Sequence, residues 1–259
     1  MGTDVFVSLL PGDCLALMRE LEKESIDCIL CDLPYGGMTR NKWDQSLPEQ
    51  ELWQHYRRII KPHGAIILFS AGRFTASLIH SAGELFRYTL VWHKTTPTGF
   101  LNANRQPLRA HEDIVVCYKR QPAYHPQKTC GHKRKVSTAR HKRDCIRTTN
   151  YGNHGLSTYD STERYPTSVL TFSTDKQRGA YHPTQKPVPL LEWLIRSYTD
   201  EGDIVLDNCM GSGSTGVACV NTRRSFIGME LDPAYFEIAQ QRVAAARGKS
   251  FDVEGRNVK

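Results

Sequence analysis

The four residues Asp32-Leu33-Pro34-Tyr35 are suited to holding a planar base that carries an amino group. A carboxylate oxygen can accept one N–H of the amino group, a neighbouring backbone carbonyl can accept the other, and a tyrosine ring can stack on the base. Proline fixes φ and has no N–H, so the carbonyls around it keep their direction. Taken alone, the same four residues are also typical of a strand-ending turn with a buried tyrosine.

A second group of residues, far along the chain, is typical of a nucleotide-binding loop. The apolar run 203–207 is followed by Gly211, Gly213 and Gly216 in the spacing G-x-G-x-x-G, and a helical pattern begins directly after it. Glycines permit a tight turn and a close approach of the backbone to a ligand, and the helix N-terminus offers free N–H groups. About 20 residues on, a second apolar run ends at Glu230, whose carboxylate can accept both hydroxyls of a ribose. This pattern predicts a cofactor that contains adenosine.

The surroundings of the loop indicate which adenosine cofactor is bound. A dinucleotide needs a second mononucleotide-binding half, and after Glu230 only one helical stretch and a short tail follow. A carboxylate at Asp207 would repel a pyrophosphate, whereas S-adenosylmethionine carries a sulfonium and an ammonium group that are attracted to carboxylates. S-adenosylmethionine is therefore the predicted cofactor.

In their order along the chain, these motifs resemble those of the S-adenosylmethionine-dependent DNA methyltransferases that modify exocyclic amino groups. The order with the glycine loop last is the circularly permuted one called the beta class, as in type II and phage-like modification methylases. The resemblance covers nearly the whole chain, and it rests on the segments 6–13, 32–35, 181–187 (Y-H-P-T-Q-K-P), 207–216 and 228–235 (G-M-E-L-D-P-A-Y).

The resemblance implies a role for each matching position. The implied catalytic residues are Asp32, Leu33, Pro34 and Tyr35. The implied cofactor-binding residues are Asp13 at the adenine, Thr184 and Lys186 along the methionine part, Asp207, Asn208, Gly211 and Gly213 in the glycine loop, Glu230 at the ribose with Leu231 beside it, and Asp32. Two positions depart from the family pattern, because Leu33 replaces the first proline of the common D-P-P-Y and Asn208-Cys209 replaces Pro-Phe. Leu33 still presents its carbonyl, so the contact with the base is expected to remain.

Apolar runs that alternate with helical patterns predict an α/β fold with helices on both faces of a mostly parallel sheet. The resemblance makes this a doubly wound, Rossmann-like sheet in circularly permuted order. The expected strands are 4–9, 26–31, 64–70, 86–93, 112–118, 203–207 and 225–229, and the expected helices are 12–22, 49–60, 72–82, 187–199, 214–220 and 233–246. The expected organisation is a catalytic half, 1–118, a basic target-recognition insertion without regular pattern, 119–180, and a cofactor-binding half of the same domain, 181–259. Ligands of such sheets bind at the carboxyl ends of the strands.

The positive charge of the chain is concentrated in one segment. The formal net charge is +7, yet residues 119–147 hold ten Lys or Arg and one acid, while the rest of the chain holds 24 basic and 26 acidic residues. Such a segment is either a solvated loop or a phosphate-binding arm, and its place between the catalytic blocks favours the arm. The residues predicted to bind DNA are Lys133, Arg134, Lys135, Arg140, Lys142 and Arg143.

Cysteine, metal and membrane signals are weak. Cys130, His132, His141 and Cys145 do not have the spacing of common zinc fingers, so no metal is predicted. Cys31 is interpreted as a strand residue, because amino methylation needs no thiolate. No apolar run approaches the roughly 18 residues of a membrane span, and the N-terminus lacks the features of a signal peptide. The cytoplasm is the expected location.

The leading interpretation is therefore a site-specific DNA methyltransferase that acts on the N6 amino group of adenine in a flipped-out base. Cytosine N4 is the alternative target, although enzymes of that kind more often have serine at the position of Asp32. A catalytically silent DNA-binding protein and an RNA or protein methyltransferase are weaker alternatives, because the motif residues are intact and their order is that of the DNA enzymes. DNA is the expected partner, and the sequence leaves open a homodimer and a cognate restriction endonuclease.

Overall fold

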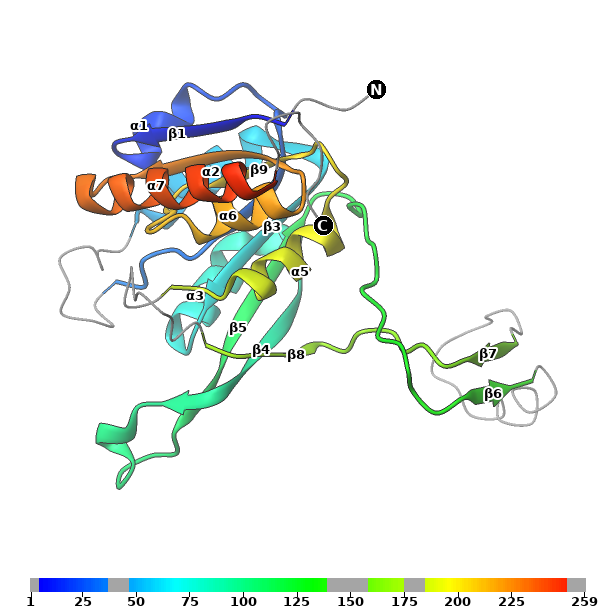
Figure 1. Cartoon of the computed structure of the whole chain (residues 1–259). Helices are drawn as coiled ribbons and strands as arrows, with labels where there is room; N and C mark the ends of the chain where they lie inside the picture. Colours follow the sequence, from blue (N-terminus) through cyan, green and yellow to red (C-terminus); the bar gives the residue numbers. More distant parts are fainter. Residues whose placement is uncertain (1–4, 37–46, 139–157, 175–184, 251–259) are drawn as a thin grey trace. The chain divides into compact units, whose positions relative to one another are not determined.

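The computed structural model describes residues 5–36, 47–138, 158–174 and 185–250, and its centre is an eight-stranded sheet in the order β1-β10-β9-β2-β3-β5-β4-β8 (Figure 1). The strands of this sheet are β1 Val7–Pro11, β2 Ile26–Cys31, β3 Ile60–Ser70, β4 Phe86–Thr98, β5 Arg109–Tyr118, β8 Val169–Phe172, β9 Ile204–Asp207 and β10 Ser225–Glu230. The neighbours from β1 to β3 are parallel, as are β4 and β8, while β5 is antiparallel to both β3 and β4. The sheet is therefore mixed and mostly parallel.

Helices cover both faces of this sheet. The helices are α1 Cys14–Arg19, α2 Glu49–Ile59, α3 Arg73–Ala82, α5 Val188–Tyr198, α6 Ser214–Asn221 and α7 Pro233–Ser250, with the short 3-10 turns η1 Gly83–Leu85 and η2 Phe100–Asn102. Successive strand residues face opposite sides, so in β2 Ile29 packs with α1, α2 and α3, while Leu30 packs with α5 and α6. The result is a three-layer α/β arrangement whose strands are buried on both faces, which is why they are almost continuously apolar.

Contacts divide the chain into two units, Met1–His125 with Ser168–Lys259, and Pro126–Thr167. The second unit holds the antiparallel pair of β6 Lys135–Ser137 and β7 Tyr159–Ser161. The sequence predicts no regular element in 119–180, and this prediction is wrong for β6, β7 and β8. These strands are too short, and too mixed in polarity, to show a period of two. The proposed boundaries at 119 and 180 stay a prediction.

The strands and helices expected in the main unit are confirmed, with differences at their ends. Helix α1 begins later than expected because the Asp13 side chain accepts a hydrogen bond from the N–H of Ala16 and caps the helix, and it ends earlier than expected, at Arg19. β4 and β5 extend farther than expected and form a long hairpin. Among the described helices, none combines the length and the apolar character needed to cross a membrane.

Gly216 of α6 lies where no side chain fits, and this predicts a measurable cost of substitution. A Cβ atom there would lie 2.7 Å from the Phe226 ring and 2.8 Å from Val243. Gly216→Ala is expected to lower the free energy of unfolding by about 1–2 kcal/mol, because overpacking outweighs the gain in helix propensity. Gly248→Ala in α7, where no atom lies within 4 Å, is the matched control and is expected to be neutral or stabilising. Urea denaturation of both variants checks this, and equal effects would contradict it.

Candidate functional site

Four acidic residues lie at the carboxyl ends of four adjacent parallel strands. Asp13 follows β1, Glu230 ends β10, Asp207 ends β9 and Asp32 follows β2. The register pairs Pro11 with Glu230 and Gly228 with Asp207, so these ends are level with one another. The sequence predicts Asp32, Asp207 and Glu230 at the carboxyl ends of strands, and the structure places them there together with Asp13, while their roles stay a prediction.

Asp32 is the first member of a buried chain of charges. The Lys186 ammonium donates a hydrogen bond to Asp32 Oδ2 at 2.6 Å and lies 3.2 Å from Glu112 Oε2. The Lys94 ammonium donates to the other oxygen of Glu112. The side chains of Lys186 and Lys94 are only 8% and 10% exposed, and those of Glu112 and Asp32 are 17% and 25% exposed. Two carboxylates therefore alternate with two ammonium groups, so the network is neutral overall.

The pairing controls which groups are ionised. Burial raises the pKa of Asp32, and the Lys186 ammonium opposes that rise. Burial alone would also raise the pKa of Glu112, but the ammonium groups of Lys186 and Lys94 outweigh it and hold that pKa below its usual range. Asp32 is therefore a carboxylate whose charge depends on one lysine, and it is the acid of the network nearest to solvent.

Tyr35 closes one side of this site. Its hydroxyl donates to Asp32 Oδ1 at 3.2 Å, and its ring stacks on Phe74 of α3 with a centroid distance of 4.8 Å and an interplanar angle of 29°. Leu33, between them in sequence, is buried in the core, and Pro34 is half-buried. The loop therefore combines a carboxylate, a rigid turn and an aromatic pair.

The glycine loop is bound directly to the acid of the neighbouring strand. Glu230 accepts the N–H of Gly211 at 2.8 Å through one carboxylate oxygen and the N–H of Asp232 at 2.9 Å through the other. Gly211 and Gly213 have φ of +51° and +79°, which favours glycine, and a Cβ on Gly213 would lie 2.9 Å from the Ala239 Cβ.

These groups fit a nucleoside. A carboxylate offers about four acceptor sites, so Glu230 keeps acceptors for ribose hydroxyls after both backbone contacts are made. Leu231, which follows it, is 69% exposed and offers an apolar surface to an adenine ring. Asp13 is the N-cap of α1 beyond the adjacent strand β1, and its place near the adenine stays a prediction.

Asp207 and Asn208 are turned into the protein. Asp207 accepts hydrogen bonds from Thr215 Oγ1 at 2.6 Å and from the N–H of Cys209 at 3.1 Å, and burial raises its pKa to about 6. The Asn208 side-chain oxygen accepts from the Tyr56 hydroxyl at 2.7 Å. Both side chains therefore hold the shape of the glycine loop, and their predicted contacts with a cofactor stay a prediction.

Two further expectations concern single residues. Lys186 was predicted to bind the methionine part of a cofactor, and the structure gives its ammonium the carboxylates of Asp32 and Glu112 as partners. Cys31 lies in β2, and burial raises its pKa to about 12, so its thiol stays protonated at neutral pH.

The predicted DNA-binding segment is only partly described. In the unit Pro126–Thr167, Lys133 and Lys135 are exposed, while Arg134 forms a two-point ion pair with Asp160, with N–O distances of 2.7 and 2.6 Å. Lys128 pairs with Glu163 at 3.0 Å. The charge of this segment is therefore partly balanced by acids that follow it in sequence. Predicted positions outside the described residues are Thr184, Arg140, Lys142 and Arg143, together with His141 and Cys145.

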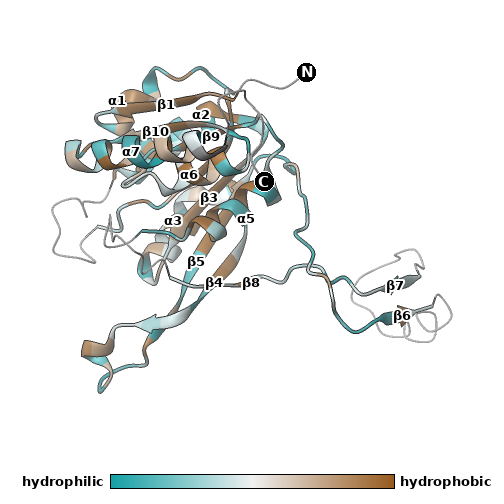
Figure 2. Ribbon diagram, viewed as in Figure 1, coloured by the Kyte–Doolittle hydropathy of each residue, from teal (hydrophilic) through white to brown (hydrophobic). Residues whose placement is uncertain are grey.

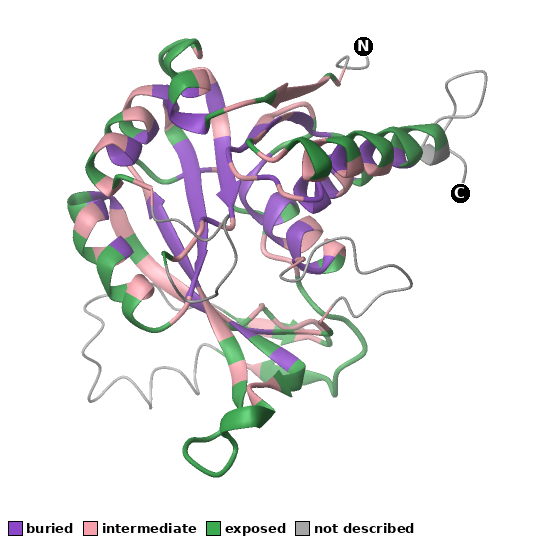
Figure 3. Cartoon of the chain, turned by 90° about the vertical axis from the view of Figure 1, so that its left-hand side faces the viewer, coloured by how far each residue is buried: buried purple, intermediate pink, exposed green. Residues whose placement is uncertain are grey.

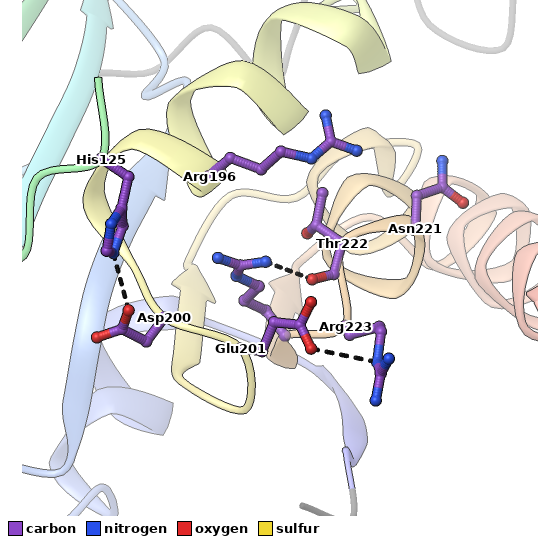
Figure 4. A pocket seen from close by; sticks show the side chains of 8 residues that line it. His125, Arg196, Asp200, Glu201, Asn221, Thr222 and Arg223 are labelled. Carbon is purple, nitrogen blue, oxygen red and sulfur yellow. Dashed lines mark hydrogen bonds and ion pairs between the residues drawn. The ribbon is translucent and has the colours of Figure 1, made fainter. Parts of the chain in front are cut away.

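A surface pocket of about 470 Å³ lies at the opposite edge of the sheet, where β9 and β10 begin (Figure 4). Four of its side chains form two pairs, His125 with Asp200 at 2.8 Å and Arg223 with Glu201 at 3.4 Å. It therefore has no part in a site built at the carboxyl ends of the strands.

Sequence reasoning did not identify Lys94, Glu112 and Phe74 as members of the site. The sequence H-E-D within β5 marks Glu112 as polar just before the apolar part of the strand, which is a weak signal. The pairing of Lys94 with Glu112 depends on the register of β4 against β5, in which Trp92 lies opposite Glu112. Nothing in the linear sequence indicates that register.

The chain is similar to known DNA methylases over most of its length. Residues 26–241 match the N6/N4 DNA methylase family. The type II methyltransferase M.HpaI of Haemophilus parainfluenzae is 28% identical over 251 residues, which span 91% of this chain and 73% of the relative. The type II methyltransferase M2.DpnII of Streptococcus pneumoniae is 27% identical over 92% of this chain and 89% of its own.

Solved structures share the fold. The PvuII DNA methyltransferase, which is cytosine-N4-specific, superposes with a TM-score of 0.66 at 18% identity and covers 93% of this chain and 87% of its own. The complex of M1.HpyAVI with S-adenosylmethionine superposes with a TM-score of 0.64 at 22% identity, over 92% of this chain and 99% of its own. The chain therefore belongs to the N6/N4 DNA methylase family, in which S-adenosylmethionine is the methyl donor.

Proposed function

We propose that this DNA methylase is site-specific and modifies the N6 amino group of adenine in a base flipped out of the duplex. The observation that carries the proposal is the Asp32 carboxylate, held at a strand end by Lys186 and Tyr35, with a backbone carbonyl at Leu33 next in the chain. The proposed architecture behind it is a doubly wound sheet in circularly permuted order, since the strand that precedes the glycine loop comes late in the sequence.

The chemistry required of the chain follows from the amino group. An exocyclic amino nitrogen is a poor nucleophile because its lone pair is delocalised into the ring. S-adenosylmethionine supplies an electrophilic methyl group on a sulfonium. Asp32 would accept one N–H and the Leu33 carbonyl the other, which favours a more tetrahedral nitrogen and stabilises the positive charge that develops on it. Tyr35 would stack on the base.

Lys186 affects what Asp32 can do. Its ammonium opposes the rise in the pKa of Asp32 that burial causes and so favours the ionised carboxylate as an acceptor, and the proton can leave after the nitrogen has been methylated. Phe74, already stacked on Tyr35, would support the ring that faces the base.

Cytosine N4 is the alternative target, because both amino groups present the same donors to Asp32. Asp32 favours adenine as the target, because the cytosine-N4 enzymes of the family that the chain resembles more often have serine at this position. Lys133 and Lys135, both exposed, are proposed to contact DNA phosphates. A homodimer, a partner endonuclease and a cytoplasmic location remain expectations.

One experiment tests the function and its target base. The protein is incubated with labelled S-adenosylmethionine and DNA, the DNA is digested to nucleosides, and the methylated positions are mapped. N6-methyladenine at a fixed sequence is the expected product. N4-methylcytosine would support the alternative, and absence of label in DNA would overturn the proposal.

Replacing Glu230 with alanine is expected to weaken binding of S-adenosylmethionine by about 1.5–3 kcal/mol, because charge-assisted hydrogen bonds to the ribose are lost. The Gly211 N–H also loses its partner, so the loop loosens in the same variant. Calorimetry of the purified protein measures the effect. Glu237→Ala, an exposed acid on α7, is the control and should bind like the parent. Equal affinity of both variants would show that Glu230 does not hold the ribose.

A further inference from the structure

The hairpin of β4 and β5 extends beyond the body of the sheet, and its end is exposed. Every residue from Phe100 to Arg109 is exposed, and Figure 3 shows this end of the hairpin in green beyond the buried strands. Residues 95–109 do not belong to the two hydrophobic clusters that pack the sheet against its helices, in contrast to the buried part of the same strands. This stretch, 99–109, is called the hairpin tip below.

The hairpin tip projects from the edge of the sheet that carries Asp32. β4 runs parallel to β3, and β3 runs parallel to β2, so the end of β4 and the start of β5 lie on the side where β2 ends. The base of the hairpin is part of the charge network, because Lys94 of β4 and Glu112 of β5 bind each other and Glu112 contacts Lys186. Arg109 is three residues from Glu112, about 10 Å along the strand.

The exposed side chains of the hairpin tip are of the types that contact nucleic acids. Phe100 and Leu101 are 77% and 85% exposed, and Figure 2 shows a brown turn at the end of the hairpin beside a teal loop. Between His93 and His111 the sequence contains no Asp or Glu. Arg105 and Arg109 follow the apolar pair within the hairpin tip, and within the described chain neither forms an ion pair.

The tip is also ordered by its own backbone. Gly99 has φ of +89° and turns the chain, after which Asn102 N–H bonds to the Gly99 carbonyl and Ala103 N–H to the Phe100 carbonyl, both at 3.0 Å. Arg105 N–H bonds to the Asn102 carbonyl at 2.8 Å. Phe100 and Leu101 therefore lie on a turn of defined conformation. Their exposure to water is unfavourable unless a partner covers them.

We propose that the hairpin tip binds duplex DNA beside the target base, with Phe100 and Leu101 packed against the bases next to the extruded one and Arg105 and Arg109 on the flanking phosphates. This inference rests on the proposed action of the protein on a flipped base. Extruding a base leaves a gap in the stack, and apolar side chains that fill such a gap repay part of the unstacking cost. A two-stranded ribbon also fits the width of the major groove.

The charge of the tip favours DNA over a second copy of this chain. Two copies of the tip would bring together arginines without acids, which is unfavourable, whereas phosphates complement them. The hairpin also rises from the network that holds Asp32, so a partner on the tip lies near the reacting base.

The test compares two double variants on the duplex that carries the mapped methylation site. Phe100→Ala with Leu101→Ala is expected to slow methylation of the fully paired duplex by at least about 10-fold, because filling the stack is worth a few kcal/mol. The same variant should recover close to the parent's rate when the target base lies opposite an abasic position, since that base needs little extrusion. Arg105→Ala with Arg109→Ala should lower the salt dependence of DNA binding by up to about two phosphates' worth.

Matched controls lie at the opposite edge of the sheet. Phe6→Ala removes an exposed phenylalanine before β1, and Arg247→Ala removes an exposed arginine near the end of α7, and both should behave like the parent. All four side chains of the tip variants are exposed, so melting temperatures should not change.

Three results would overturn the inference. The first is an apolar variant that methylates paired duplex as fast as the parent, and the second is a loss of rate that the abasic duplex does not rescue. The third is a concentration-dependent dimer of the parent, seen by sedimentation, that the apolar variant abolishes, since the tip would then bind a second copy. A parent protein that leaves DNA unmethylated is a different result, because it refutes the proposed function itself.

Discussion

Replacing Asp32 with alanine is expected to lower the rate of methyl transfer at least about 100-fold, because the acceptor for the reacting amino group is lost. Binding of S-adenosylmethionine should stay nearly unchanged, since the ribose acid and the glycine loop lie on other strands. The fold should survive, because Lys186 keeps Glu112 as a partner when Asp32 is removed. Single-turnover rates with the mapped duplex, together with calorimetry of the cofactor, measure the two quantities separately.

Two further variants sharpen this test. Asp32→Asn keeps a carbonyl oxygen at the same place without the charge, so its rate should lie between those of the parent and the alanine variant. Asp200→Ala removes an exposed carboxylate at the opposite edge of the sheet, where it pairs with His125, and should leave the rate unchanged. Near-normal turnover of Asp32→Ala would show that the active site lies elsewhere.

Replacing Lys186 with methionine is expected to have the second large effect, on both stability and the pH profile. Removing one partner of a buried ion pair typically costs about 3–5 kcal/mol, and here two carboxylates lose the ammonium between them. Asp32 stabilises the positive charge that develops on the amino nitrogen only when it is ionised, so activity falls as pH drops through its pKa. Burial raises that pKa and Lys186 opposes the rise, so the variant should lose activity at a higher pH than the parent.

The pH dependence of the single-turnover rate separates this role from a merely structural one. Lys186→Arg keeps the positive charge and should retain the parent's acidic limb. Lys94→Met also removes an ammonium from the network, but Lys94 contacts Glu112 and not Asp32, so its acidic limb should move less. If the acidic limb of Lys186→Met coincides with that of the parent, Lys186 does not control the charge of Asp32.

The sequence predicted the carboxyl-end site because each part of it is local. A strand, a turn and the acid that follows are neighbours in the chain, and parallel strands bring such ends together at one edge. Asp32, Asp207 and Glu230 could be placed in this way. The Lys94–Glu112–Lys186 chain could not, since it joins two strands and a helix start whose relative register depends on packing across the whole sheet.

The distribution of charge in the segment 119–147 also could not be predicted in full from the sequence. The linear count for residues 119–147 gives one acid, but the antiparallel pairing of β6 and β7 brings Asp160 to Arg134, and Glu163 comes to Lys128. Short edge strands were missed for a related reason. β8 has only four residues, and its one buried side chain, Leu170, gives no period to detect.

The two points where the chain enters and leaves the unit Pro126–Thr167 have a consequence for how such proteins diversify. His125 N–H bonds to the Ser197 carbonyl, and the Ser168 carbonyl accepts from Val91 N–H, both within the main unit. With both ends fixed independently of what lies between them, the intervening chain can lengthen at little entropic cost, about 0.6 kcal/mol per doubling of a flexible loop. Insertions and exchanges there need not disturb the strand ends, so this unit can change in length and charge while the acids at the strand ends keep their geometry.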